Sequence, residues 1–145
     1  MKLYFEDGFH LVVKRDCPTC TLIEPEIRKL VESGDFGQNL RIYIQDDPSY
    51  LSDLSQSVSD ASLESSYRLK IETVPTLIRF EKGEETSRSV GWVREEWSQL
   101  LNDSMFGEHL PESRPGCGSL TVMPGAKETL DARFGDLPLN SRTIE

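Results

Sequence analysis

The sequence predicts an α/β fold, because short strand-like runs alternate with helix-like segments between residues 9 and 101. The strand-like runs are apolar, rich in β-branched residues and bounded by charges or turn residues. The longest helix-like segment instead repeats its apolar residues at helical spacing. The expected order is strand, helix, strand, helix, strand, strand, helix.

The first half of the chain contains three clear elements and one weak one. Residues 9–14 and 40–45 are predicted strands. Residues 18–33 predict a helix that ends at Gly34 and has one apolar face, formed by Ile23, Ile27, Leu30 and Val31. Residues 3–5 could add a short strand, turned back by Asp7-Gly8.

The second half is less evenly patterned. Residues 49–70 hold many serines, which favour caps and loops, so we expect a broken helix, or a loop and then a helix ending near Lys70. Residues 76–81 and 85–90 form two strands of a hairpin, and residues 94–101 form a helix.

The composition changes after residue 103. Residues 105–145 carry half of the 10 glycines and half of the 8 prolines, which indicates turns. One short helix is expected where Ala126, Leu130 and Phe134 are spaced by four residues, before Gly135. We therefore divide the chain into a domain, residues 1–103, and a C-terminal extension, residues 104–145.

Composition also limits the function. A net charge of −9 disfavours nucleic acid and anionic membranes as partners. No apolar run approaches the length of a membrane span, and the first residues lack the apolar core of a signal peptide, so we expect a cytoplasmic protein. Three cysteines do not make a secreted disulfide framework. We expect a monomer.

The chemistry-bearing motif is Cys17-Pro18-Thr19-Cys20, at the start of the first predicted helix. Such a pair can close and open a disulfide without unfolding the chain, so it is a candidate two-electron switch. The alternatives are a structural disulfide and a zinc site. Zinc would need two further ligands from Cys117, His10 and His109, without the usual paired spacing, so we expect neither a metal nor another cofactor.

The chain resembles the thioredoxin superfamily over roughly residues 9–101. Four features carry this resemblance: the C-x-x-C that opens a helix, Pro25 five residues after the second cysteine, Val74-Pro75-Thr76 before a strand, and residues 80–84 followed by Val90-Gly91. The resemblance implies a three-layer α/β/α sandwich around a mixed central sheet of about four strands, followed here by an irregular C-terminal extension.

Position in the helix assigns the roles of the two thiols. A helix N-terminus favours the thiolate, which is the nucleophile. Cys17, expected to be the more exposed, should attack a substrate disulfide, and the more buried Cys20 should resolve the mixed disulfide. We therefore expect a thiol-disulfide oxidoreductase whose partners are protein disulfides and an unidentified reductant.

The resemblance also implies a substrate groove. In the family the proline matching Pro75 is cis and faces the cysteines, and the backbone before it pairs with an extended substrate segment. The alternative for Trp92 is that it is a half-buried residue of the core rather than a groove residue. The predicted groove residues are Pro18, Thr19, Thr73, Val74, Pro75, Thr76, Gly91 and Trp92.

Some positions depart from the family pattern. Asp16 stands where thioredoxins have Trp, and Leu11 stands where they have a buried Asp that assists proton transfer. Glutaredoxins follow their proline loop with Gly-Gly and an acid that bind glutathione, whereas this chain has Val90-Gly91-Trp92, which argues against a dedicated glutathione site. The missing Trp and the missing buried Asp favour a rival from another class, a binding module that keeps the fold without turnover, whereas the intact C-x-x-C and Pro75 favour the enzyme.

Cys117 lies between Gly116 and Gly118 in the extension. We favour an unreactive cysteine in a loop packed over the domain, because most free cysteines are buried and inert. The alternative is a third redox thiol that reaches Cys17 or a partner protein.

Overall fold

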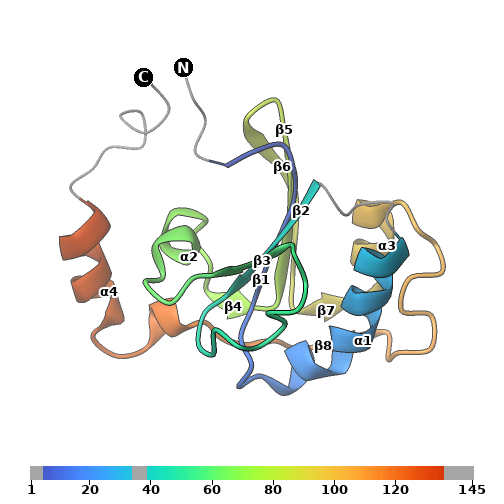
Figure 1. Cartoon of the computed structure of the whole chain (residues 1–145), viewed down its shortest axis with the longest axis horizontal. Helices are drawn as coiled ribbons and strands as arrows, with labels where there is room; N and C mark the ends of the chain where they lie inside the picture. The colour runs from blue at the N-terminus through green and yellow to red at the C-terminus, as the bar shows by residue number, and fades with distance from the viewer. Residues whose placement is uncertain (1–4, 34–38, 136–145) are drawn as a thin grey trace.

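Helices lie on both faces of a central sheet in the computed structural model, which describes residues 5–33 and 39–135 (Figure 1). The helices α1 (Pro18–Ser33) and α3 (Arg94–Leu101) lie on one side of the sheet. The helices α2 (Glu64–Arg68) and α4 (Ala126–Leu130) lie on the other. The predicted three-layer α/β/α sandwich is confirmed.

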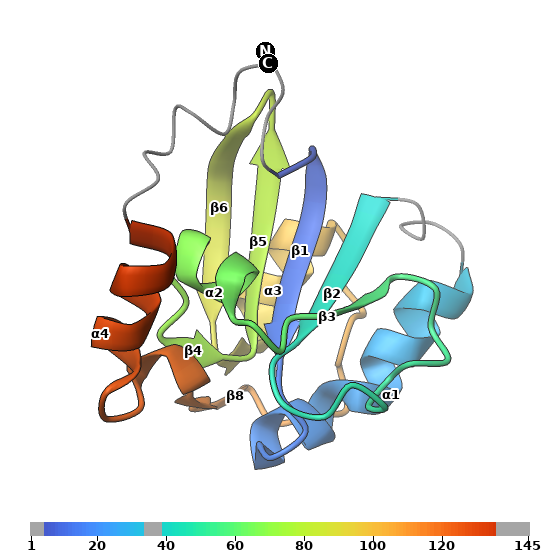
Figure 2. The ribbon, with the colours of Figure 1, turned by 60° about the vertical axis from the view of Figure 1, so that its left-hand side comes forward.

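The central sheet has five strands in the order β3-β2-β1-β5-β6. Figure 2 shows β2, β1, β5 and β6 side by side. β1 runs parallel to β2 and antiparallel to β5, so the sheet is mixed, as predicted. The bounds are β1 Gly8–Val13, β2 Leu40–Ile44, β3 Ser57–Ser59, β5 Thr76–Glu81 and β6 Glu84–Val90.

The sheet has one strand more than the predicted number of about four, because residues 49–70 contain a short strand in addition to the expected loop and helix. They contain turns, then β3 parallel to β2, then a helix of only five residues, α2. No residue of β3 is buried, so the strand shows no apolar pattern. Its serines give no strand signal in the sequence. Backbone pairing with residues 42–44 specifies this strand instead.

The other predicted elements agree closely with the structure. α1 and α3 have the predicted bounds, Pro25 lies inside α1, and each predicted strand of the sheet differs by at most one residue at either end. The weak strand at residues 3–5 falls mostly outside the described residues, and Phe5 lies in a bend.

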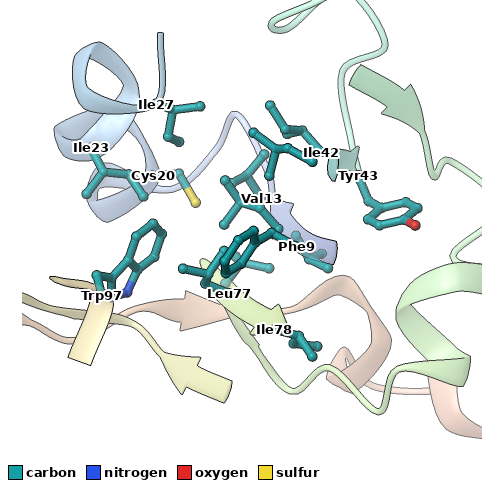
Figure 3. Packing of buried hydrophobic residues seen from close by; sticks show 14 of the residues in the cluster. Phe9, Val13, Cys20, Ile23, Ile27, Ile42, Tyr43, Leu77, Ile78 and Trp97 are labelled. Carbon is teal, nitrogen blue, oxygen red and sulfur yellow. The ribbon is translucent and has the colours of Figure 1, made fainter. Parts of the chain in front are cut away.

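A hydrophobic core joins α1 to the sheet. Figure 3 shows Ile23 and Ile27 of α1 facing Val13 of β1 and Leu77 of β5, with Trp97 of α3 beside them. Each of these five side chains is at most 1 % exposed. Burying each aliphatic one stabilises the fold by about 1.5–3 kcal/mol. This packing fixes the first turns of α1, and hence the motif, against β1.

The described part of the C-terminal extension packs back on residues 5–103 through two pairs of two-residue strands. β7 (Trp92–Val93) pairs with β8 (Ser113–Arg114), and β4 (Thr73–Val74) pairs with β9 (Cys117–Gly118). The predicted short helix is present as α4, which continues into a π-helical turn, Asp131–Gly135. A 3-10 turn, Leu120–Val122, precedes it. The division at residue 103 stays a prediction.

Candidate active site

The two cysteines of the motif lie at the N-terminus of α1. Cys17 directly precedes the first helical residue, Pro18, where the missing N–H of proline would have no intrahelical acceptor. The Cys20 backbone N–H donates a hydrogen bond to Cys17 Sγ at 3.3 Å. An unpaired N–H of the first helical turn thus stabilises negative charge on the Cys17 sulfur.

Both thiols are buried, although Cys17 is the slightly more exposed of the two, in the order expected. Cys17 is 2 % exposed and Cys20 is 0 % exposed. Figure 3 shows the Cys20 side chain pointing from α1 toward Val13 and Leu77 of the sheet. Cys17 is buried for a different reason, because the C-terminal extension lies beside it, as shown below.

Their surroundings shift the two thiols in opposite directions. The Cys20 thiol, as a hydrogen-bond donor, lowers the pKa of Cys17 to about 5, although burial opposes the shift. The Cys117 thiol and the backbone N–H groups of Cys20 and Thr19 lower this pKa further. Burial raises the pKa of Cys20 well above its ordinary value, and the Cys17 sulfur acts in the same direction. The surroundings thus favour the thiolate at Cys17 and the protonated thiol at Cys20.

The proline loop, residues 73–76, faces the dithiol. Its Val74–Pro75 peptide bond is cis. The Cys17 sulfur lies 3.6 Å from the Val74 carbonyl oxygen, to which it donates a hydrogen bond when Cys17 is protonated. Within the loop, the Thr76 hydroxyl donates to the Thr73 carbonyl at 2.7 Å. Residues 17 and 74 are 57 positions apart in sequence, so the sheet brings the two motifs together.

The strand order and this juxtaposition decide the fold. Two central strands are parallel, β5 and β6 continue the sheet antiparallel, and the dithiol that opens α1 faces the loop that leads into β5. The chain has the thioredoxin fold. This fold accounts for the sequence features that carry the resemblance, from the C-x-x-C to the residues after β6.

Solved structures similar to this chain include two thioredoxin-fold proteins. One is thioredoxin O2 from Arabidopsis thaliana in its oxidised state, with 19 % identity, a TM-score of 0.45, and 66 % of this chain and 71 % of that chain covered. The other is a thioredoxin candidate from Neisseria meningitidis, with 18 % identity, a TM-score of 0.43, and coverage of 72 % and 82 %. No protein-family model and no curated protein matches the chain.

The backbone edge predicted to receive a substrate is already paired within this thioredoxin fold. Val74 lies opposite Cys117 and Thr73 opposite Gly118 in the β4–β9 ladder. The Thr19 hydroxyl of the motif donates to the Pro115 carbonyl at 2.6 Å. Residues 114–118, which we call the strap, therefore occupy the place where an extended substrate was expected.

The remaining predicted groove residues lie around the strap. The Gly91 N–H donates to the Pro75 carbonyl at 2.7 Å, and a Cβ on Gly91 would lie 3.1 Å from the backbone nitrogen of Gly116. Trp92 is fully buried, pairs with Arg114 and donates from its indole to the Pro111 carbonyl at 2.8 Å. Pro18 is exposed.

Two side chains near the dithiol went unassigned in the sequence-based site. Lys14 is 7 % exposed and its ammonium donates to the Gly118 carbonyl at 2.7 Å, so it links β1 to the strap. Burial raises the pKa of the Tyr50 phenol, and the Glu24 carboxylate and the two motif sulfurs act in the same direction. Lys14 ends a predicted strand, a weak signal of site placement. Tyr50 lies in the serine-rich segment, where no pattern marks it.

The two departures from the family pattern have clear positions. Leu11, in place of the buried Asp, is 1 % exposed and belongs to the apolar core. Asp16 is exposed, and its backbone N–H donates to the Asp46 carboxylate at 2.9 Å. Proton transfer to Cys20 therefore has no carboxylate at the Leu11 position.

In residues 5–33 and 39–135, no three His, Cys, Asp or Glu side chains are arranged to hold a metal ion, so these residues offer no ligand set for the zinc alternative. His10 bonds to the Tyr43 hydroxyl at 2.9 Å, and His109 pairs with Glu26 at 3.0 Å. Across the same residues, no helix is both long enough and apolar enough to cross a membrane.

Proposed function

We propose that this protein is a thiol-disulfide oxidoreductase in which Cys17 is the nucleophile and Cys20 the resolving thiol. The observation that carries the proposal is the dithiol at the start of α1, where the Cys20 N–H donates to Cys17 Sγ at 3.3 Å and the cis-proline loop faces the Cys17 sulfur. Cys17, with a pKa lowered to about 5 chiefly by the Cys20 thiol, is a thiolate at neutral pH. Cys20 keeps its proton because it is buried.

The reaction follows from these protonation states. The Cys17 thiolate attacks one sulfur of a substrate disulfide, and the other substrate sulfur leaves as a thiolate that takes a proton. Cys20 then gives up its proton and attacks the Cys17 sulfur, which releases the second substrate thiol. Two electrons pass from the dithiol to the substrate, and a Cys17–Cys20 disulfide remains. A reductant returns the pair to its dithiol form.

The lowered pKa also bears on the direction of exchange. Stabilising the Cys17 thiolate stabilises the reduced form and so raises the reduction potential. Thioredoxin, with a cysteine pKa of about 7, has a potential of about −270 mV, and DsbA, with about 3.5, has about −120 mV. A Cys17 pKa of about 5 predicts an intermediate potential.

The partners we propose are protein disulfides and a cellular reductant, in the cytoplasm, with the protein acting as a monomer. The net charge of −9 argues against nucleic acid and anionic membranes as partners. The Val90-Gly91-Trp92 sequence provides neither the Gly-Gly pair nor the acid that bind glutathione in glutaredoxins. Trp92 is, in addition, fully buried.

Catalytic turnover tests the proposal. The wild-type chain should accelerate the reduction of a peptide disulfide by dithiothreitol, and Cys17→Ser should lower the rate to that of dithiothreitol alone. The double variant Cys20→Ser/Cys117→Ser should accumulate a mixed disulfide between Cys17 and the peptide, visible by intact mass. A wild-type rate equal to the uncatalysed rate would contradict the proposal.

The second candidate is a binding module without turnover, favoured by the low exposure of Cys17 and by Leu11 at the proton-transfer position. It predicts a partner-binding surface that survives Cys17→Ser. The turnover assay separates the two, because a binding module gives no acceleration with any of the variants.

A further inference from the structure

The strap occupies the groove with the geometry of a bound peptide. In the antiparallel β4–β9 ladder, its Cys117 lies opposite Val74. Val74 is the residue that directly precedes the cis bond to Pro75. Pro115 and Gly118 receive hydrogen bonds from Thr19 and Lys14 at 2.6 and 2.7 Å. Backbone pairing with regularly spaced side chains is how a sheet edge binds an extended peptide.

The fit between strap and proline loop depends on a glycine. A Cβ on Gly116 would lie 2.3 Å from the Val74 carbonyl oxygen and 2.6 Å from the Thr73 methyl group. The Val74 oxygen belongs to the backbone and cannot rotate away. Only glycine lets the strap approach this closely, so Gly116 sets the depth at which Cys117 enters the site.

A buried polar network anchors the chain directly after the strap. The Gln45 side-chain amide donates to Ser66 Oγ at 2.9 Å and to Ser119 Oγ at 2.7 Å, and its oxygen accepts from the Leu120 N–H at 3.0 Å. Gln45 is 2 % exposed, and Ser66 and Ser119 are 0 % exposed. Satisfied buried hydrogen bonds of this kind fix one arrangement, so the position of Cys117 is specified.

Cys17 and Cys117 meet at the same backbone position, because Cys17 Sγ lies 3.6 Å from the carbonyl oxygen of Val74, the residue opposite Cys117 in the β4–β9 ladder. The Cys117 thiol lowers the pKa of Cys17, and the Cys17 thiol, after burial, raises the pKa of Cys117. All three cysteines are free thiols in the structure. Cys117 holds the place in which the substrate cysteine of a mixed disulfide would stand.

We propose that the strap is a built-in substrate segment and that Cys117 forms a disulfide with Cys17 in competition with Cys20. This proposal rests on the proposed exchange chemistry of Cys17. In the oxidised chain, the Cys117 thiolate attacks the Cys17 sulfur and the Cys17–Cys20 bond breaks. The electron pair leaves on the Cys20 sulfur, which takes up the proton that Cys117 released. The step needs no external oxidant, because one disulfide replaces another.

This exchange gives the oxidised chain two forms. The Cys17–Cys117 form ties the strap across the site and excludes external peptides, whereas the Cys17–Cys20 form leaves the strap held only by noncovalent contacts. Cys20 is a protonated thiol in the tied form, because burial raises its pKa. The external partner inferred from the strap is an extended segment with a cysteine flanked by small residues, as in Gly116-Cys117-Gly118.

Disulfide mapping in a full-length Cys20→Ser chain tests the proposal, with glutathione disulfide as the oxidant. We expect intact mass to show the loss of two hydrogens, and peptide mapping to show Cys17 joined to Cys117. In Cys20→Ser/Cys117→Ser, Cys17 should instead carry glutathione. Should Cys20→Ser fail to fold, the wild-type chain provides the test, because its oxidised form should contain both the Cys17–Cys20 and the Cys17–Cys117 isomers.

A matched pair of glycine variants tests the strap itself. In the Cys20→Ser background, Gly116→Ala should push the strap away and shift the product from the Cys17–Cys117 disulfide to glutathione-bound Cys17. Gly118→Ala is the control, since its Cβ would meet nothing closer than 3.5 Å, and it should keep the Cys17–Cys117 product.

The outcomes separate this proposal from the proposed function. If Cys17 takes up glutathione in Cys20→Ser while Cys117 stays free, the strap proposal is overturned and the exchange chemistry of Cys17 stands. If Cys17 neither reacts with glutathione disulfide in the variants nor pairs with Cys20 in the wild type, both are overturned.

Discussion

At the scale of single residues, the two motif thiols differ because their surroundings differ. Cys17 receives hydrogen bonds from the Cys20 thiol and from backbone N–H groups, which stabilise its thiolate. Cys20 lies inside the apolar core with Ile23 and Trp97, where a charge is costly. Cys17 therefore favours its thiolate form, whereas Cys20 keeps its proton.

This difference predicts the titration of the reduced protein. The thiolate signal of Cys17, followed by ultraviolet absorbance or by the chemical shift of its Cβ, should have a midpoint near pH 5. The Cys17→Ser variant should lose this transition and keep the thiols that ionise at higher pH. A Cys17 midpoint near the ordinary value of about 8.5 would contradict the assigned hydrogen bonds.

The same shift predicts how stability depends on pH. The folded pKa of Cys17 is lowered to about 5, below the unfolded value of about 8.5, so its contribution is fully present above pH 8.5. It is lost as the pH falls through about 5. In urea unfolding under reducing conditions, the stability of wild type relative to Cys17→Ser should therefore rise from about pH 5 to pH 8.5. A difference that stays constant over this window would contradict the shift.

At the scale of elements, the sequence predicted those with a strong apolar pattern and missed those specified by pairing. α1, α3, β1, β2 and β5 have buried apolar residues, so their patterns are visible in the sequence, whereas Ser89 is the one buried residue of the edge strand β6. β3 has no buried residue, and β4, β7, β8 and β9 are two residues long. Their partners lie up to 45 positions away, as for Thr73 and Gly118, and local sequence does not encode that choice.

The Gln45 network gives an element-scale prediction. Replacing Gln45 by leucine removes the acceptor of the Leu120 N–H and the donor to Ser66 and Ser119. Leaving such buried groups without partners costs about 1–3 kcal/mol, measurable by urea unfolding. The exposed Gln99→Leu serves as the control and should change stability by no more than about 0.5 kcal/mol. Equal effects of the two substitutions would mean that the network does not anchor the extension.

At the scale of the whole molecule, the resemblance predicted the meeting of two distant motifs, and the structure added a third segment. The C-x-x-C spacing marked Cys17 and Cys20 in the sequence, and the resemblance marked Pro75. The sequence could not show that Cys117 lies opposite Val74, because that pairing depends on the path of residues 102–116 around the molecule. The burial of Cys17 and Trp92 was missed for the same reason.

The reduction potential of the Cys17–Cys20 pair tests the central claim most directly. It is measured by thiol trapping and intact mass in graded glutathione or dithiothreitol buffers, with Cys117→Ser to remove the third thiol. We predict a reversible two-electron couple between about −270 and −120 mV. A pair that never oxidises, or one that stays a disulfide well below about −300 mV, would contradict exchange catalysis and favour the binding module.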